Sequence, residues 1–238
     1  AEGDMRYHAP GSAGNRGRFL GSLGLEEASA LGVELAHSRR VLVRTEEGER
    51  LFGEGGAEIG GAELGAPPSG RAHLDSGYDG ILVRGSGLAA SVTVADCMPI
   101  YVCDFASGAF GVLHSGWKGT GILASAVAAL AAAAGSPPAA ISIILGPAIG
   151  PCCYAVSEGR ALGFEREFGP ESVLRRDGRH YLDLRAANLA LARRLGVGAL
   201  SSIDLCTSCD ESLGSCRREG QGAFTRMMAL AALPPSGR

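Results

Sequence analysis

The chain has 238 residues, of which 46% are hydrophobic, so it can bury a sizeable core. Its 22 Lys and Arg residues stand against 25 Asp and Glu residues, giving a formal charge of -3, and no basic stripe is present, which argues against nucleic acid as a partner. The longest apolar stretch falls short of the roughly 20 residues of a membrane span, and the N-terminal residues carry no apolar signal segment, so we expect a cytoplasmic protein without a membrane partner.

Histidine and cysteine usage excludes two further classes of protein. The 5 histidines are too few for a multicopper oxidase, whose copper centres need on the order of ten imidazoles. The 7 cysteines are odd in number, include the adjacent pair Cys152 and Cys153, and follow no spacing typical of a secreted disulfide scaffold. Reduced thiols in a reducing compartment are the better interpretation.

The first half of the chain changes from an irregular segment to strands and then a helix. Residues 48–76 are rich in Gly and Pro with little periodicity, which predicts a long surface loop or insertion. Residues 80–114 hold β-branched, apolar segments (ILVRG, SVTVADCMPIYVCDF and AFGVLH) that predict strands. Residues 120–134 are Ala-rich and apolar almost all round, which predicts a buried helix ended by Gly135.

The second half repeats the alternation of strand and helix. A strand over 140–145 is followed by a helix from about 155 to 168, then by the short strand HYLDL and a helix between the N-cap Asp183 and Gly196. SSIDLC reads as a strand, and MMALAAL is compatible with a strand or a helix. This pattern predicts an α/β fold with mixed β-sheets flanked by helices, in one layered domain over residues 1–238 with the Gly/Pro-rich insertion at about 48–76.

The predicted hairpin between residues 95 and 117 brings a cysteine close to a histidine. If residues 105–108 form its loop, Cys97 faces Gly116, two positions beyond His114 on the same face. Such diagonal neighbours lie roughly 7 Å apart at Cβ, and a thiolate with an imidazole favours zinc. The plain alternative is a small buried cysteine beside a hydrogen-bonded core histidine.

A glycine-rich turn, SGWKGTG, follows His114 and leads into the Ala-rich helix. Glycines let the backbone approach an anion, amides at a helix start attract phosphate, and Lys118 adds a charge. The turn lacks the Walker pattern. It is therefore either a phosphate cradle or a tight connection from strand to helix.

Four ordered motifs resemble the laccase-domain or "polyphenol oxidase" family: VADCMPIYVCD…GVLHSGWKG, LGPAIGPCCYAV, LDLRAANLA and CTSC…SCRREG. The resemblance extends from about His37 to Arg226. It implies a single-domain α/β protein whose zinc is held by two histidines and one cysteine. It also implies purine nucleoside chemistry, namely phosphorolysis of adenosine, inosine, guanosine or methylthioadenosine, together with adenosine deamination.

Carried over to this chain, the resemblance implies His37, Cys97 and His114 as zinc ligands, with copper possible only as a single ion. Three protein ligands leave a fourth position for water or substrate, as in catalytic zinc sites. Cys97, His114 and Asp96 would be the catalytic residues, although in a regular strand Asp96 faces away from Cys97 and would need a bulge or a turn. Two departures from the family pattern are a short N-terminal segment and the insertion at 48–76, whose His73 is the rival third ligand.

The resemblance also points to phosphate and substrate contacts. In addition to Lys118 and Gly116, the C-terminal segment supplies Arg217, Arg218 and Arg226, and guanidinium groups bind phosphate through paired hydrogen bonds. The alternative is an exposed charged turn in which Glu219 pairs with a neighbouring arginine.

The remaining cysteines are open to other interpretations. The pair Cys206 and Cys209 has the spacing of a metal knuckle, but no two further ligands are spaced accordingly, so the pair is interpreted as structural. Cys153, before a helix start, could be an acidified nucleophile with His114 as base, or could pack under the Gly-Pro loop with Cys152.

Three functions follow from these observations. The first is a zinc-dependent purine nucleoside enzyme that uses phosphate or water. The second is a hydrolase of small amide or peptide-like substrates built on Cys97 or Cys153 with His114. The third is a non-catalytic metal-binding protein that has lost its N-terminal pocket. Metal analysis separates the second from the others, and nucleoside turnover separates catalysis from binding.

Overall fold

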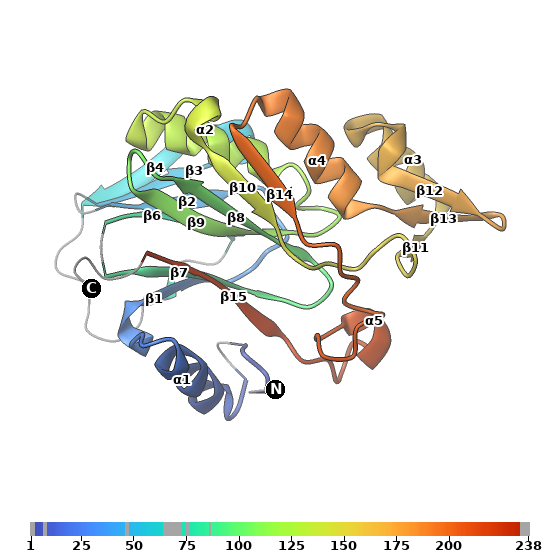
Figure 1. Ribbon diagram of the computed structural model, residues 1–238, viewed down its shortest axis with the longest axis horizontal. Helices are drawn as coiled ribbons and strands as arrows, with labels where there is room; N and C mark the ends of the chain where they lie inside the picture. Colours follow the sequence, from blue (N-terminus) through green and yellow to red (C-terminus); the bar gives the residue numbers. More distant parts are fainter. Residues whose placement is uncertain are drawn as a thin grey trace.

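The computed structural model of the protein describes residues 3–6, 9–45, 48–63, 73–74, 77–85 and 87–233. Two mixed sheets are stacked face to face, with helices on the outer side of each (Figure 1). The larger sheet has the strand order β14 (Ala199–Ser202), β10 (Ser142–Leu145), β8 (Met98–Asp104), β9 (Ala109–Ser115), β6 (Gly80–Arg84), β2 (Val41–Arg44), β3 (Gly48–Phe52) and β4 (Glu58–Glu63). The smaller sheet has the order β15 (Met227–Ala232), β7 (Ala89–Val94), β1 (Ala30–Val33) and β5 (His73–Leu74).

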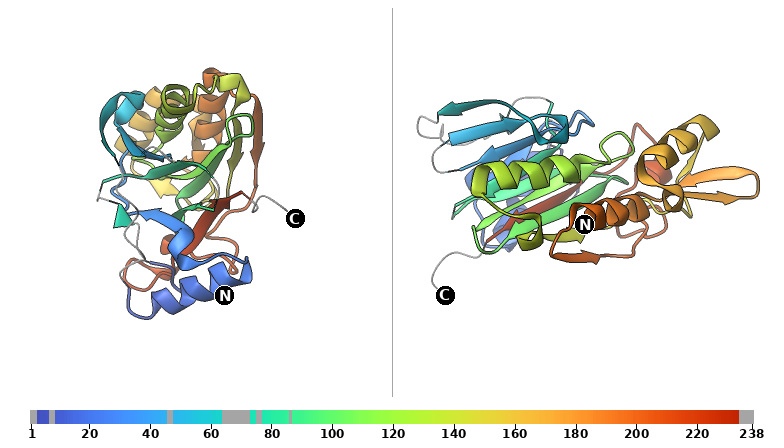
Figure 2. Two further views of the ribbon diagram at one scale, coloured as in Figure 1. Left: turned by 90° about the vertical axis from the view of Figure 1, so that its left-hand side faces the viewer. Right: turned by 90° about the horizontal axis from the view of Figure 1, so that it is seen from above.

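Helices cover the two outer faces. On the larger sheet lie α2 (Ile122–Ala134) and α4 (Leu184–Leu195), with α3 (Glu158–Phe168) beside α4, as Figure 2 shows from above, while α1 (Ser12–Ser22) lies beyond the smaller sheet. A third sheet beside α3 contains β11 (Ala155–Val156), β13 (Arg179–Leu182) and β12 (Val173–Arg176). The short elements are α5 (Cys216–Glu219) and the 3₁₀ turns Glu27–Ser29, Glu54–Gly56, Pro138–Ala140 and Pro170–Ser172.

Two apolar cores explain the sequence pattern of the strands. One lies between α2, α4 and the larger sheet, and the other lies between the two sheets. Strands β7 and β9 are buried along their whole length, because both of their faces are covered. The predicted α/β fold with mixed sheets and flanking helices is therefore confirmed. No described helix combines the length and apolarity that crossing a membrane would require.

Several predicted boundaries are confirmed. The β8–β9 hairpin pairs Asp104 with Ala109, the register assumed from the sequence. Helix α4 begins where the Asp183 carboxylate accepts the Ala186 amide at 2.9 Å, and it ends at left-handed Gly196. The segment MMALAAL resolves as strand β15, because it pairs with β7 at the edge of the smaller sheet.

Other boundaries are corrected by pairing that local pattern cannot reveal. The predicted loop over 48–76 contains β3 and β4, an edge hairpin that buries Phe52; residues 64–72 and 75–76 lie outside the described residues. Helix α3 starts at Glu158, because residues 155–156 pair with β13. Helix α2 starts at Ile122, after left-handed Gly121. The strand read from SSIDLC lies slightly earlier, at Ala199–Ser202, where it pairs with β10.

Candidate metal centre and adjoining cavity

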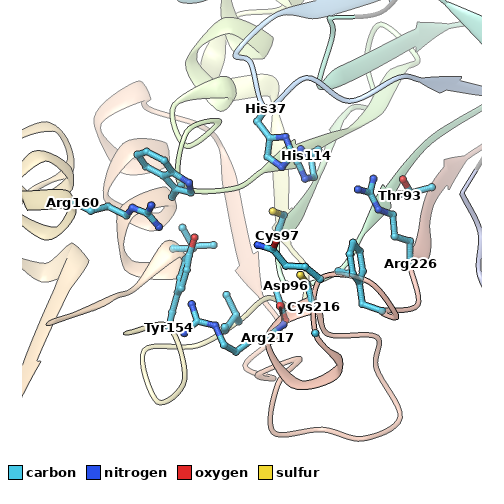
Figure 3. A pocket seen from close by; sticks show the side chains of 17 residues that line it. His37, Thr93, Asp96, Cys97, His114, Tyr154, Arg160, Cys216, Arg217 and Arg226 are labelled. Carbon is cyan, nitrogen blue, oxygen red and sulfur yellow. Dashed lines mark hydrogen bonds between the residues drawn. The ribbon is translucent and has the colours of Figure 1, made fainter. Parts of the chain in front are cut away.

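Two histidines and a cysteine from separate segments meet at one end of the sheets (Figure 3). One ligand atom from each of His37, Cys97 and His114 lies within 4.8 Å of the others. The two imidazole rings meet edge to face, with their centroids 5.1 Å apart. His114 is buried in β9, Cys97 is half-buried just before β8, and His37 is exposed in the loop before β2. The group can hold a metal ion, and its thiolate and imidazole donors suit zinc.

The hairpin register places Cys97 beside Gly116. The β8–β9 pairing ends at Met98 opposite Ser115, so Cys97 and Gly116 face each other just beyond it. A Cβ atom on residue 116 would lie only 2.7 Å from Cys97 Sγ. Gly116, expected from the sequence to contact substrate, therefore has a steric role: its missing side chain leaves room for the thiol.

A buried carboxylate that the sequence analysis did not select organises both histidines. Asp79 is 0% exposed and contacts His114 Nδ1 at 2.8 Å, which leaves Nε2 for the metal centre. It also accepts the amides of Ala36 (3.2 Å), His37 (3.0 Å) and Ser38 (2.6 Å). These bonds hold His37 in a left-handed conformation with φ 57. Asp79 immediately precedes β6, which runs parallel to β2, and this adjacency brings the carboxylate under the histidine loop.

The charges at this centre support one another. Burial pushes the pKa of Cys97 up, but His114 and His37 outweigh it and lower this pKa to about 6. Burial pushes the pKa of His114 down, but the Cys97 thiolate and Asp79 raise it to about 9. Burial likewise opposes the charge on Asp79, yet the contact with His114 and the bonds from Ser38 keep its pKa below the usual value. Without metal, the centre therefore holds a thiolate and an imidazolium at neutral pH.

Metal affinity is expected to rise with pH. Between about pH 7 and 8.5, Cys97 is already a thiolate, whereas His114 must lose its proton to become a ligand. One displaced proton changes the affinity of this centre about tenfold per pH unit, and the dependence levels off above about pH 9. Chelator competition on the metal-free protein measures this slope. A flat profile across that range would contradict the protonated state of His114.

Replacing Asp79 by asparagine is expected to weaken metal binding at this centre by about 10- to 100-fold, the usual effect of losing a carboxylate behind a ligating histidine. The amide keeps the side chain's shape but not its charge. Asp104→Asn is the matched control, because Asp104 is also buried and hydrogen-bonded but lies at the far end of β8. Equal zinc affinities of the two variants in chelator competition would argue against the positioning role of Asp79.

Asp96 has the turn that its proposed role requires. It lies between β7 and β8 in a left-handed conformation with φ 76. Its Oδ1 accepts the Thr207 hydroxyl at 2.7 Å, and its Oδ2 accepts the Arg217 amide at 2.7 Å. Both residues belong to the C-terminal segment, which therefore fixes the carboxylate beside Cys97 on the wall of one cavity.

A cavity of about 700 Å³ adjoins the three candidate ligands, a volume typical of small-molecule sites. Three arginines on its wall each lie over an aromatic ring, measured from the guanidinium carbon to the ring centroid: Arg160 over Trp117 at 4.2 Å, Arg217 over Tyr154 at 5.6 Å and Arg226 over Phe224 at 5.4 Å. In Figure 3, Arg160 and Tyr154 lie on one side of the ligands and Thr93 and Arg226 on the other.

These three guanidinium groups are available to an anion. Within the described part of the chain, no carboxylate lies within salt-bridge distance of Arg160, Arg217 or Arg226. Arg217 donates weakly to the Ala155 carbonyl at 3.3 Å and is otherwise directed along Tyr154. The cavity therefore combines flat apolar surfaces with unneutralised positive charge.

Three residues expected to bind phosphate or substrate, Gly116, Lys118 and Arg218, are not among the described residues that line the cavity. Lys118 is exposed, with Nζ 5.5 Å from the Trp117 ring centroid. Two amides at the end of its turn are used internally, since Thr120 N donates to Gly116 O at 2.7 Å and Ile122 N to Gly119 O at 3.0 Å. The turn connects strand β9 to helix α2. Arg160 was not predicted to bind substrate, because it lies in α3, outside every motif seen in the sequence.

Arg218 has a structural environment. Its guanidinium donates to the carbonyls of Thr207 at 2.7 Å and Asp210 at 2.9 Å and pairs with Glu219 at 3.0 Å. It does not line the cavity. The sequence alternative of a charged turn with Glu219 as partner therefore describes Arg218, whereas Arg217 and Arg226 reach the cavity.

The remaining candidate ligands also have defined places. Cys153 Sγ lies 3.4 Å from Cys209 Sγ and is not part of the cavity wall, so the structure does not pair Cys153 with His114. The expectation that the Cys206–Cys209 pair lacks further ligands is wrong, because the fold brings Cys152 and Cys153 beside it. In β5, the backbone of His73 pairs with Gly32 of β1, and the side chain of His73 lies outside the described structure.

The fold and this centre define a laccase-domain protein. The family model described as "Multi-copper polyphenol oxidoreductase laccase" matches residues 10–234, and the chain belongs to this family. The crystal structure of the Bacillus licheniformis hypothetical protein YfiH is similar, with a TM-score of 0.80 at 26% identity over 97% of this chain and 85% of that one. The crystal structure of YlmD from Geobacillus stearothermophilus gives a TM-score of 0.78 at 27% identity, over 95% of this chain and 83% of YlmD.

Curated relatives carry names from purine metabolism. "Purine nucleoside phosphorylase YlmD" of Geobacillus stearothermophilus is 34% identical over 162 residues, which are 65% of this chain and 59% of YlmD. A purine nucleoside phosphorylase of Corynebacterium glutamicum is 32% identical over 211 residues, 87% of this chain and 76% of the relative. "Adenosine deaminase RL5", from an unknown prokaryotic organism, is 33% identical over 152 residues, which are 60% of this chain and 58% of RL5. The chain thus spans less than two thirds of several relatives that it matches, and only 37% of a mouse one.

Proposed function

We propose that the protein is a zinc-dependent purine nucleoside enzyme, which cleaves adenosine, inosine, guanosine or methylthioadenosine with phosphate and deaminates adenosine. The observation that carries this proposal is the convergence of His37, Cys97 and His114 beside a cavity lined by aromatic rings and by arginines that form no ion pair within the described part of the chain. Relatives named purine nucleoside phosphorylase and adenosine deaminase support the same class of substrate. The odd number of 7 cysteines, without the spacing of a secreted disulfide scaffold, supports a reducing compartment, and we place the activity in the cytoplasm.

The donor set suits the metal that the proposal requires. Two imidazoles and one thiolate are a catalytic zinc combination that leaves one coordination position open. Zinc held there would supply Lewis acidity to a bound oxygen. A single copper ion is also compatible with these donors, but 5 histidines do not suffice for a multicopper cluster.

The cavity wall can orient both substrates. A purine base fits against the aromatic side chains of Trp117, Tyr154 or Phe224, since every base offers a flat π-face. Burial, followed by the nearby Cys97 charge, raises the pKa of Tyr154 to about 12, so its hydroxyl remains a donor at neutral pH. Arg160 and Arg217, both near Tyr154, would hold phosphate against the sugar. Asp96, which is fixed by hydrogen bonds from Thr207 and Arg217, would transfer protons in the deamination of adenosine.

Incubation of zinc-replete protein with adenosine, with and without phosphate, tests the proposal. Adenine that forms only with phosphate indicates phosphorolysis, and inosine that forms without phosphate indicates deamination. Bound zinc without either product would favour the non-catalytic metal-binding alternative.

A cysteine hydrolase remains the second candidate because of one specific arrangement. Cys97, His114 and Asp79 form a nucleophile, base and orienting carboxylate in series, with 2.8 Å between His114 and Asp79. His37 is a donor that such a hydrolase would not need. Protein that hydrolyses amide substrates without bound metal, and is inhibited by added zinc, would favour this candidate.

A further inference from the structure

A second cluster of potential metal ligands lies outside the cavity. Strands β10 and β14 are neighbours and run parallel, so the loops that follow them begin at the same end of the sheet, as Figure 1 shows. The first loop carries Cys152 and Cys153, and the second carries Cys206 and Cys209. A parallel bridge between Ala148 and Cys206 fastens the loops together. The topology therefore brings together two pairs of cysteines that lie about fifty residues apart in the sequence.

The sulfur atoms have the spacing of a metal site. All four Sγ atoms lie within 4.8 Å of one another, with 3.4 Å between Cys153 and Cys209 and 3.7 Å between Cys152 and Cys209. In a tetrahedral zinc site with metal–sulfur bonds of about 2.3 Å, the sulfur atoms lie roughly 3.8 Å apart. A disulfide would require about 2.05 Å, and all four cysteines are free.

Backbone groups shape the cluster for thiolates. The Gly150 amide donates to Cys206 Sγ at 3.2 Å, a bond that favours the charged form of the sulfur. A Cβ atom on residue 150 would lie 3.2 Å from Cys152 Sγ and 3.3 Å from Cys206 Cβ, so glycine permits the close approach. Simple packing does not account for the group, because Cys152 and Cys209 are exposed.

We propose that Cys152, Cys153, Cys206 and Cys209 form a second metal site that binds one zinc ion through four thiolates. Four protein ligands close the coordination sphere, so this site is structural, unlike the three-ligand centre at His37, Cys97 and His114. It holds together two loops beside the cavity, of which the first lines the cavity through Ile149 and Tyr154. Tyr154 follows Cys153, and Thr207, between Cys206 and Cys209, donates to Asp96.

Metal counting on intact protein tests the site independently of catalysis. Native mass spectrometry and elemental analysis should find about two zinc ions in the wild type and about one in Cys209→Ser, whose exposed side chain makes it the mildest ligand variant. Cys97→Ala should also keep about one. Cys103→Ser, which removes a half-buried thiol in β8, should keep both and serves as the control.

Cobalt spectroscopy identifies the ligands even if Cys209→Ser folds poorly. Cys97→Ala loaded with cobalt should show the intense near-ultraviolet thiolate-to-metal bands of a four-sulfur site. The proposal is overturned if Cys97→Ala binds no metal, if Cys209→Ser retains the wild-type metal count, or if freshly purified protein contains a disulfide among these cysteines. A protein that keeps this zinc but turns over no nucleoside would refute the proposed function and leave the second site intact.

Discussion

Replacing Cys97 by alanine is expected to remove zinc from the three-ligand centre and to lower nucleoside turnover by roughly a thousandfold or more, because the metal contributes several kcal/mol to such reactions. His37 and His114 remain, but two imidazoles form a weak site. Elemental analysis of the purified variant and its turnover of adenosine, with and without phosphate, measure both effects.

The controls for this experiment follow from the other cysteines. Cys103→Ser removes a thiol from the same hairpin, away from the centre, and should leave turnover unchanged. If the four-cysteine site is occupied, Cys97→Ala loses one of two zinc ions and not both. Wild-type turnover by a Cys97→Ala protein that lacks this zinc would refute the metal-dependent mechanism.

Removal of the Arg160 or Arg217 side chain should weaken phosphorolysis selectively. Each would lose a charge-assisted hydrogen bond to phosphate, worth about 1.5 to 3 kcal/mol, or roughly 10- to 150-fold in kcat/KM for phosphate. Alanine at residue 217 keeps the backbone amide that orients Asp96, so the experiment isolates the guanidinium. Adenosine deamination, which uses water in place of phosphate, should change by less than about threefold. Both reactions are measured on one preparation of each variant.

Lys118→Ala is the matched control for these arginine variants. The turn after His114 resembles an anion site in sequence, but Lys118 is exposed and does not line the cavity. We therefore expect less than about a threefold effect on either reaction. A large and selective loss of phosphorolysis in Lys118→Ala would return the phosphate site to the glycine-rich turn. Equal loss of both reactions in the arginine variants would indicate that they bind the nucleoside.

The sequence predicts those parts of the centre that depend on local geometry. The register of the β8–β9 hairpin follows from its turn, so the proximity of Cys97 and His114 could be derived from residue spacing. His37 could be assigned only through the family resemblance, because its left-handed loop depends on Asp79, far away in sequence. Asp96 illustrates the same limit: alternation in a strand turns it away from Cys97, and hydrogen bonds from residues 207 and 217 turn it back.

Features that depend on which strands become neighbours could not be predicted from spacing. The four cysteines meet because β14 pairs with β10, and no ligand spacing within one segment encodes that pairing. Arg160 reaches the cavity because helix α3 packs beside Trp117, although its sequence is that of an ordinary surface helix. The residues that the sequence analysis missed are thus those whose positions are set by long-range packing.

The contacts of Asp79 make the two histidine ligands interdependent. One carboxylate orients the imidazole of His114 and, through three successive amides, fixes the backbone conformation of His37. Displacement of Asp79 would therefore release both ligands together, and a shift of the 36–38 loop would remove hydrogen bonds that hold this carboxylate in place beside His114. Loss of the metal centre should consequently be cooperative, passing from intact to dismantled without a stable form that retains a single correctly placed histidine.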